Sequence, residues 1–258
     1  MDLELKDKVA AVTGGTRGIG RSIALRLAAE GCHVAVCGRS LDSLHQTEAE
    51  LTSYGSRVAA IQTDISVPGA AVGFVDQVKS AFGGVDLLVA NAGGSFGAGL
   101  VDTALDDWKR TFDTNLFHAV DTARAVVPSM QQRGGGSILI ISSISGWKPV
   151  ERRAQYAAAK AAEIQFARSL ARELAPLRIR VNALSPGSTW VEQGGWARFR
   201  AREPEAFAKF VREELPWGRL ATPEEIADVA VFLLSERARW INGANVPVDG
   251  GQGSPSAW

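Results

Sequence analysis

Residues 8–31 read KVAAVTGGTRGIGRSIALRLAAEG, and this stretch decides the fold. The segment 8–13 has the short apolar character of a buried strand, and 19–31 predicts a helix that ends at Gly31. Between them, Gly14, Gly18 and Gly20 lie in one turn. Glycine lets the backbone turn sharply and approach a pyrophosphate at a helix N-terminus. The spacing is TGxxxGxG rather than GxGxxG, but after a first strand it favours dinucleotide binding over a merely tight loop.

The rest of the chain repeats this strand-then-helix pattern. Further strands are expected at 33–37, 57–64, 85–93, 136–142, 179–185 and 244–251. Further helices are expected at 41–55, 68–83, 103–133 and 154–175. Continuous apolar strands indicate burial on both faces. Together these features predict one α/β domain over 1–258, a Rossmann-type doubly wound parallel sheet of about seven strands with helices on both faces.

Composition narrows the classes of function. The chain has 258 residues and a formal net charge of +0, which argues against a nucleic-acid partner. Cys32 and Cys37 are five apart on one predicted strand, so they face opposite sides and cannot pair with each other. No metal-ligand spacing, secretion signal or long apolar run is visible, so we expect a cytoplasmic protein without a metal or a membrane span.

Tyr156 and Lys160 stand four apart in QYAAAK (155–160) on an alanine-rich predicted helix. Residues at i and i+4 share one helix face. At roughly 5 Å and an effective dielectric of about 20, the lysine would lower the pKa of a phenol by about two units. That would bring the phenol toward the range of general acid–base catalysis. The alternative is an ordinary surface Tyr/Lys pair.

The end of the second strand bears on cofactor choice. An acidic residue there would bind the adenosine ribose 2′-hydroxyl, as in NAD sites. This strand ends in VCGRS, with Gly38 at the acidic position and Arg39 and Ser40 after it. Arg39, helped by Arg17 in the glycine turn, can hold a 2′-phosphate through its fork of donors. The sequence therefore favours NADP(H) over NAD; alternatively, Arg39 is a solvated loop residue.

Four motifs occur in order: TGGTRGIG (13–20), NAG (91–93), SS (142–143) and YAAAK (156–160). Together with SPG (185–187) and NVPVDGG (245–251), they make nearly the whole chain resemble the short-chain dehydrogenase/reductase family. The resemblance is closest to ketoreductases of the 3-oxoacyl-carrier-protein-reductase type.

The resemblance implies a role for each catalytic residue. Tyr156 would be the general acid in carbonyl reduction and the base in alcohol oxidation, and Lys160 would support it and bind the nicotinamide ribose. Ser143 would orient the substrate carbonyl, and Asn115 would help to hold a water chain that resupplies protons. Considered alone, Ser143 can be a helix cap and Asn115 a satisfied polar group in a helix.

The resemblance also implies a nucleotide site. Asp64 would contact the adenine, unless it only caps the following turn. Asn91, Ala92 and Gly93 would border the adenosine ribose. The full predicted set is Gly14, Thr16, Arg17, Gly18, Ile19, Gly20, Gly38, Arg39, Ser40, Asp64, Ile65, Asn91, Ala92, Gly93, Tyr156, Lys160, Pro186, Gly187 and Thr189.

The segment 188–218 is rich in aromatic and arginine residues. We interpret it as a substrate lid; the alternative is a helical insertion whose aromatic residues pack on the body of the domain. Trp147, Trp190 and Trp196 are the predicted substrate-binding residues beside Ser143 and Tyr156. Lys148, Arg152 and Arg153 can attract an anionic substrate or an acidic carrier protein, although a solvated loop explains them as well. His118 falls near Asn115, and a structural role is favoured for it.

These features predict an NADP(H)-dependent reductase that acts on a small-molecule ketone, either free or carrier-linked. The alternatives are an NAD-dependent secondary-alcohol dehydrogenase on the same scaffold and a non-catalytic NADP-sensing scaffold. The family resemblance also implies a homotetramer, or a dimer, formed through the helical regions 122–130 and 154–175 and the C-terminal residues 248–258.

Overall fold

The computed structural model describes residues 1–253 of the chain. Its strands are β1 (Val9–Val12), β2 (His33–Gly38), β3 (Val58–Gln62), β4 (Leu87–Ala90), β5 (Gly136–Ile141), β6 (Ile179–Pro186) and β7 (Asn245–Val248). Its helices are α1 (Gly18–Ala29), α2 (Leu41–Thr52), α3 (Ala70–Phe82), α4 (Leu105–Phe112), α5 (His118–Gln132), α6 (Ala154–Leu174), α7 (Gly195–Arg202), α8 (Pro204–Glu214) and α9 (Pro223–Leu234). Short turns of 3₁₀ helix occupy η2 (Ile144–Gly146), η3 (Ala175–Leu177) and η4 (Glu236–Ala238), and η1 (Asp113–Phe117) is a π-helix.

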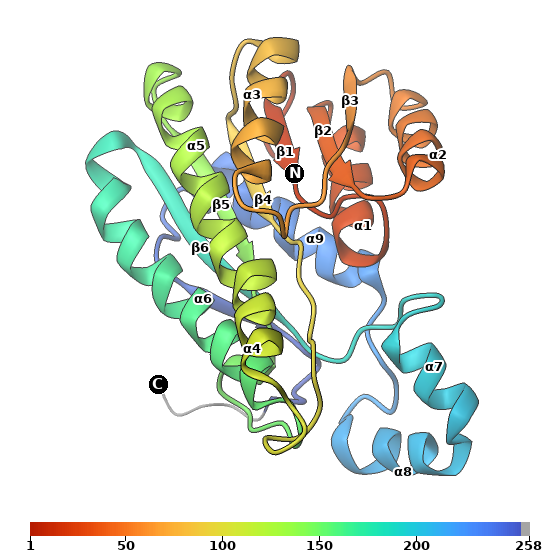
Figure 1. Ribbon diagram of the computed structural model, residues 1–258. Coiled ribbons are helices and arrows are strands. Elements are labelled where there is room, and N and C mark those ends of the chain that lie inside the picture. Colours follow the sequence, from red (N-terminus) through yellow and green to blue (C-terminus); the bar gives the residue numbers. More distant parts are fainter. Residues whose placement is uncertain (254–258) are drawn as a thin grey trace.

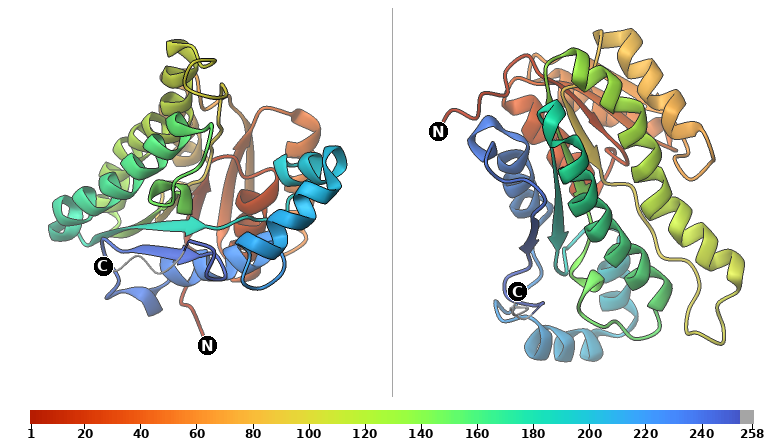
Figure 2. Two further views of the ribbon diagram at one scale, coloured as in Figure 1. Left: turned by 90° about the horizontal axis from the view of Figure 1, so that it is seen from below. Right: turned by 90° about the vertical axis from the view of Figure 1, so that its left-hand side faces the viewer.

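The strands form one seven-stranded sheet in the order β3-β2-β1-β4-β5-β6-β7. Every neighbouring pair is parallel. Helices cover both faces, with α3, α5 and α6 on one side and α1, α2 and α9 on the other (Figures 1 and 2). The predicted doubly wound fold with a single domain is confirmed.

Two apolar clusters fill the spaces between the sheet and its helices. Alternate residues of one strand enter different clusters, because successive side chains in a strand face opposite ways. In β2, Val34 and Val36 pack against α1, whereas Ala35 and Cys37 pack against α3. Cys32 lies in the first cluster and Cys37 in the second, so the two thiols are on opposite faces, as predicted.

The edge strands are less buried than the sequence indicates. Burial on both faces was expected for every strand, but β3 and β7 contain no fully buried residue. They lie at the two ends of the sheet order, where one side of each strand has no neighbouring strand. The expectation of full burial is therefore wrong for these two strands.

Residues 188–218 lie outside both core clusters for almost all of their length. They contain α7 and α8, which pair with each other beyond the carboxyl end of β6 (Figure 1). No helix in the described part of the chain is long and apolar enough to cross a membrane. The predicted C-terminal contact falls partly on residues 254–258, which lie outside the described residues.

Candidate active site

The site lies where the strand order reverses. Strands β1 and β4 are hydrogen-bonded neighbours, although β2 and β3 come between them in the chain. In open α/β sheets, ligands bind in the crevice outside the carboxyl ends of the strands at such a point. Here Thr13 and the glycine turn follow β1, and Asn91, Ala92 and Gly93 follow β4.

Asn91 holds the glycine turn in shape. Its side-chain amide donates to the carbonyl oxygens of Thr13 (3.0 Å) and Gly14 (3.1 Å). A Cβ atom on Gly20 would collide with the Asn91 side chain and the Gly14 carbonyl. Gly14 and Gly18 have φ values of +61° and +52°, which favour glycine. The predicted glycines are therefore required by close backbone approach and by left-handed conformation.

The turn suits a pyrophosphate. It leads into α1, whose N-cap residue Arg17 makes no side-chain hydrogen bond to the first turn. The free N–H groups at a helix start, together with the helix dipole, favour an anion. The residues present thus fit the phosphates of a dinucleotide.

Thr16 packs against Gly38 at the end of β2, where NAD sites carry a carboxylate. A Cβ atom on Gly38 would lie 2.7 Å from Thr16 Oγ1 and 2.8 Å from Thr16 Cγ2. An aspartate at this position would therefore displace Thr16. Arg17, Arg39 and Ser40 are exposed at the same rim. Within residues 1–253, neither guanidinium has an ion-pair partner, so both are available to an anionic ligand.

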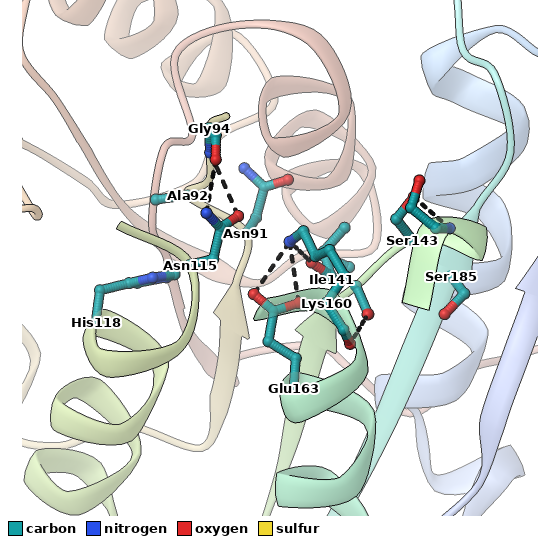
Figure 3. Close-up of polar contacts among 12 residues, drawn as sticks. Asn91, Ala92, Gly94, Asn115, His118, Ile141, Ser143, Lys160, Glu163 and Ser185 are labelled. Atoms are coloured by element: carbon teal, nitrogen blue, oxygen red, sulfur yellow. Dashed lines mark hydrogen bonds and ion pairs between the residues drawn. The ribbon is translucent and has the colours of Figure 1, made fainter. Parts of the chain in front are cut away.

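Lys160 is buried, with only 3% of its surface exposed. Its Nζ donates to the Ile141 carbonyl at the end of β5 (2.9 Å) and lies 3.0 Å from each carboxylate oxygen of Glu163 (Figure 3). A Cβ atom on Gly93 would lie 2.8 Å from Asn115 Oδ1 and 3.5 Å from Lys160 Nζ. Residues after β4, in η1 and in α6 therefore meet at one place.

Burial and mutual attraction together determine the protonation of Lys160 and Glu163. Burial opposes the ammonium of Lys160, but Glu163 and Tyr156 outweigh it, so the pKa of Lys160 is raised above its ordinary value. Burial raises the pKa of the Glu163 carboxyl to about 7, against the attraction of Lys160. Glu163 had not been singled out from the sequence. Its signal was a charged residue three positions after Lys160 on a helix face that continues with the buried Ala167 and Ala171.

Tyr156 is half-buried, and the centroid of its ring lies 5.7 Å from Lys160 Nζ. The two side chains share one face of α6, as the four-residue spacing predicts. Because Lys160 is buried, the interpretation of the two residues as an ordinary surface pair is wrong.

Asn115 sits in the π-helix η1 and is fully buried. Its Nδ2 donates to the carbonyls of Gly94 (2.7 Å) and Thr111 (2.6 Å), and its Oδ1 accepts from the Gly94 N–H (3.3 Å; Figure 3). The side chain thus ties η1 to the loop after β4. The predicted helical tract 103–133 is divided here into α4, η1 and α5, and π turns of this kind often occur at functional sites.

Ser142 and Ser143 face different ways. Ser142 Oγ donates to the Lys160 carbonyl (2.8 Å) and is buried. Ser143 is half-buried and extended; its Oγ accepts from the Ser145 N–H (3.1 Å) and contacts Ser145 Oγ (3.2 Å). Ser143 therefore does cap η2, and it is also the serine whose hydroxyl is not committed to α6.

Thr13 and His118 form a buried connection that sequence reasoning left unassigned. Thr13 Oγ1 accepts from the N–H groups of Asn91 (2.9 Å) and Ala92 (3.0 Å), so its own hydrogen is available to His118 Nε2, 3.3 Å away. Burial, helped by Lys160, lowers the pKa of His118 to about 3. His118 is therefore a neutral structural residue behind the site, as favoured from the sequence.

The remaining nucleotide residues lie on loops at the same end of the sheet. Asp64 Oδ1 accepts from the N–H (3.1 Å) and hydroxyl (2.7 Å) of Ser66, so it caps the turn after β3. That hydroxyl, more than the backbone contact, lowers the pKa of the Asp64 carboxyl. At the end of β6, the Gly187 N–H donates to the Val248 carbonyl (3.0 Å), and Thr189 Oγ1 donates to the Gly187 carbonyl (3.1 Å).

The predicted substrate residues occupy two places. Trp147 packs against the core cluster that contains α6. In the 188–218 segment, Trp196 stacks on Phe210 with ring centroids 4.6 Å apart, and Arg200 lies 4.3 Å over the ring of Trp190. The aromatic residues of α7 and α8 thus pack on one another.

The loop after β5 is attached to this segment. Lys148 Nζ contacts Glu214 Oε2 at 2.7 Å and the Gln252 carbonyl at 2.8 Å. Arg152 makes a longer, exposed contact of 3.5 Å with Asp102. Lys148 therefore joins the loop, the end of α8 and the C-terminal region.

A separate cavity of about 630 Å³ lies at the opposite edge of the sheet. It is lined by residues at the amino ends of the strands, such as Lys8, Gly136 and Ile179. Ligand sites of this fold class form at the carboxyl ends, so this cavity is not part of the site. Within residues 1–253, no cluster of three or more potential metal ligands was found.

Comparison with known proteins gives consistent matches over nearly the whole chain. The family model described as enoyl-(acyl carrier protein) reductase matches residues 14–252. Dehydrogenase/reductase SDR family member 4 from Sus scrofa is 37% identical over 253 residues, which cover 97% of this chain and 88% of that protein.

Solved structures agree. L-sorbose reductase from Gluconobacter frateurii, complexed with NADPH and L-sorbose, is 34% identical with a TM-score of 0.94, covering 99% of this chain and 100% of that one. A 7α-hydroxysteroid dehydrogenase complexed with NADH and 7-oxo glycochenodeoxycholic acid is 31% identical with a TM-score of 0.90, covering 97% and 96%. The two neighbours thus carry different nicotinamide cofactors.

Proposed function

The chain belongs to the short-chain dehydrogenase/reductase family of oxidoreductases, and on that premise we propose that it is an NADP(H)-dependent ketone reductase with Tyr156 as general acid–base. One observation carries the proposal. The buried Lys160 amine lies on the same face of α6 as Tyr156 and beside Gly93 and Asn115, at the ligand-binding end of the sheet.

The residues would act as follows. When bound at this site, a reduced nicotinamide would be the source of the hydride for the carbonyl carbon. Tyr156 gives its phenolic proton to the carbonyl oxygen as negative charge develops there, and Ser143 donates a second hydrogen bond to that oxygen. In alcohol oxidation the same groups act in reverse, with the tyrosine as base. Asn115 helps to hold the water that returns a proton to Tyr156.

The glycine turn would hold the dinucleotide. Gly14, Gly18 and Gly20 allow the pyrophosphate to approach the start of α1, and Asn91 to Gly93 border the adenosine ribose. The Lys160 amine contacts the Ile141 carbonyl and both oxygens of Glu163. With one N–H shared between the two carboxylate oxygens, a third N–H would serve a nicotinamide-ribose hydroxyl.

NADP(H) is preferred over NAD(H) because Gly38 offers no carboxylate, Thr16 packs against it, and Arg17 and Arg39 have no ion-pair partner within residues 1–253. The alternative is an NAD-dependent secondary-alcohol dehydrogenase, which is favoured by one observation: a close structural neighbour was solved with NADH. A comparison of KM for NADPH and NADH decides between them.

The substrate is a small-molecule ketone or secondary alcohol. L-sorbose and a 7-oxo bile-acid conjugate, bound by two neighbours, define the range of sizes to test. Residues 188–218 act as the lid over this substrate, and Lys148 attaches α8 to the body of the domain.

The test is oxidation of NADPH across a carbonyl panel that spans ketoses, medium ketones and oxo-steroids, repeated with Tyr156→Phe. We expect the variant to bind cofactor as the parent does and to lose about two to four orders of magnitude in turnover. Tight NADPH binding without turnover of any carbonyl would instead indicate a cofactor-sensing scaffold.

A further inference from the structure

Glu163 is a buried carboxylate that the proposed reaction does not use. It is 1% exposed and lies among buried residues of α6 that include Ala159, Ala167 and Ala171. An apolar side chain would fill this position with less cost, because a buried charge is stable only when it is paired and hydrogen-bonded. The presence of a carboxylate at this buried position must therefore be explained by the group with which it pairs.

That partner is Lys160, and the contact is symmetrical. Both oxygens of Glu163 lie 3.0 Å from Nζ (Figure 3). The amine has one further protein ligand in the described residues, the Ile141 carbonyl at 2.9 Å. Without Glu163, the ammonium would be held in the interior by a single neutral acceptor.

We propose that Glu163 is a positioning residue that keeps the buried Lys160 amine protonated and fixes it at the end of β5. The inference rests on the proposed role of Lys160 in the reaction, but its test requires no turnover. In this role Glu163 does not contact substrate or cofactor; it acts on Tyr156 and on the ribose site through Lys160.

Among residues 1–253, no other counter-ion faces the pair. The titratable or hydroxyl groups that face the pair are Tyr156 from α6, Ser142 from β5 and His118 from α5. His118 is neutral, and Ser142 donates to a backbone carbonyl of α6. Burial lowers the pKa of a lysine by up to about 3–5 units when nothing opposes it, and here Glu163 is the strongest opposing group.

The test is a pH titration of Lys160 by NMR of protein labelled with ¹³C at the lysine side chain. The Lys160 signal is assigned by its loss in Lys160→Met. In Glu163→Gln, which preserves size and polarity, we expect the Lys160 midpoint to fall by about two pH units or more. An unchanged midpoint, or a higher one, would show that the ammonium does not depend on Glu163.

Two controls sharpen the result. Glu173→Gln removes an exposed glutamate from the same helix and leaves the Lys160 midpoint where it was. Glu163→Asp keeps the charge and restores most of the difference between the Gln variant and the parent. If the enzyme turns over, the alkaline limit of kcat should move to lower pH in Glu163→Gln alone.

A folding failure of Glu163→Gln is also informative. The proposal assigns such a failure to the unpaired ammonium, so the double variant Lys160→Met/Glu163→Gln should fold. If the double variant is unfolded as well, Glu163 serves the fold in another way and the proposal is overturned. Loss of catalysis in any variant leaves these readouts intact, so the proposed function and this inference fail separately.

Discussion

Ser142 and Ser143 are adjacent serines, and because successive side chains of an extended backbone point in opposite directions, their hydroxyl groups make different contacts. The first hydroxyl donates to the Lys160 carbonyl and fastens α6 to β5, whereas the second is half-buried at the start of η2. The sequence motif contains both residues and does not separate their roles. The direction of the chain at the end of β5 does.

This difference predicts opposite effects of two alanine substitutions. Ser143→Ala should lower kcat by about 10²–10³-fold with little change in stability, because one of two donors to the developing oxyanion is lost. Ser142→Ala should cost about 1 kcal/mol of unfolding free energy, because a buried carbonyl loses its donor, and should change kcat far less. Steady-state kinetics and urea unfolding of both variants measure this. If Ser142→Ala gave the larger loss of kcat, the roles would be exchanged.

The expected preference for NADPH over NADH depends on Arg39. Its guanidinium is exposed and unpaired within the described residues, and Arg39 directly follows Gly38, where NAD sites carry a carboxylate. Arg39→Ala should raise KM for NADPH by about 10–100-fold, the value of a hydrogen-bonded charge pair, and leave KM for NADH nearly unchanged. The control is Arg124→Ala, an exposed arginine on α5. Equal changes in both KM values would show that Arg39 does not bind a 2′-phosphate.

At the scale of helices and strands, the sequence predicts where each element lies in the chain better than it predicts the residues at which the element begins and ends. All seven strands and the glycine turn lie where the apolar runs indicate, because burial between two helix layers requires those runs. The π-helix η1 was not foreseen. Its effect is to bring Asn115 toward Gly94, a contact across 21 residues that local propensity does not encode.

The pair α7–α8 has a small apolar cluster of its own. Both helices are short, 8 and 11 residues, and isolated helices of that length are unstable in water. Packing of Trp196 on Phe210 and of Phe199 on Phe207 therefore holds them together. No residue of either helix belongs to the two core clusters.

Trp196→Ala should accordingly loosen the α7–α8 pair without unfolding the domain. We expect amide hydrogen exchange in residues 195–214 to become at least about tenfold faster, while the unfolding free energy of the domain stays nearly constant. Trp217→Ala, which removes a largely exposed side chain just outside the pair, is the control. Unchanged exchange with a raised KM for the ketone would place Trp196 in the substrate pocket instead.

At the scale of the whole molecule, the main features missed from the sequence are buried polar groups. Tyr156 and Lys160 were found because their spacing is local. Glu163 and the Thr13–His118 connection depend on what packs around them, and a contact such as Lys160 Nζ to the Ile141 carbonyl joins residues 19 apart. The predicted homotetramer, with a dimer as the alternative, stays a prediction.

Two of these buried groups make opposite contributions to stability in acid. His118 has a folded-state pKa of about 3, below its ordinary 6.5, so the unfolded chain binds the extra proton and stability falls as pH drops through that window. Glu163 has a folded-state pKa of about 7, above its ordinary 4.5, so the folded chain binds the extra proton and stability rises as pH drops from 7 to 4.5.

Removing His118 and removing Glu163 should therefore change the pH dependence of the unfolding free energy in opposite directions. On acidification from pH 7, His118→Gln should lose less unfolding free energy than the parent does, and the difference should reach about 4 kcal/mol near pH 3. Glu163→Gln should lose more than the parent by pH 4.5, by up to about 3 kcal/mol. Urea unfolding at a series of pH values measures both. The argument fails if the two profiles change in the same direction, because the buried histidine would then not be neutral or the Glu163 carboxylate would not take up a proton between pH 7 and 4.5.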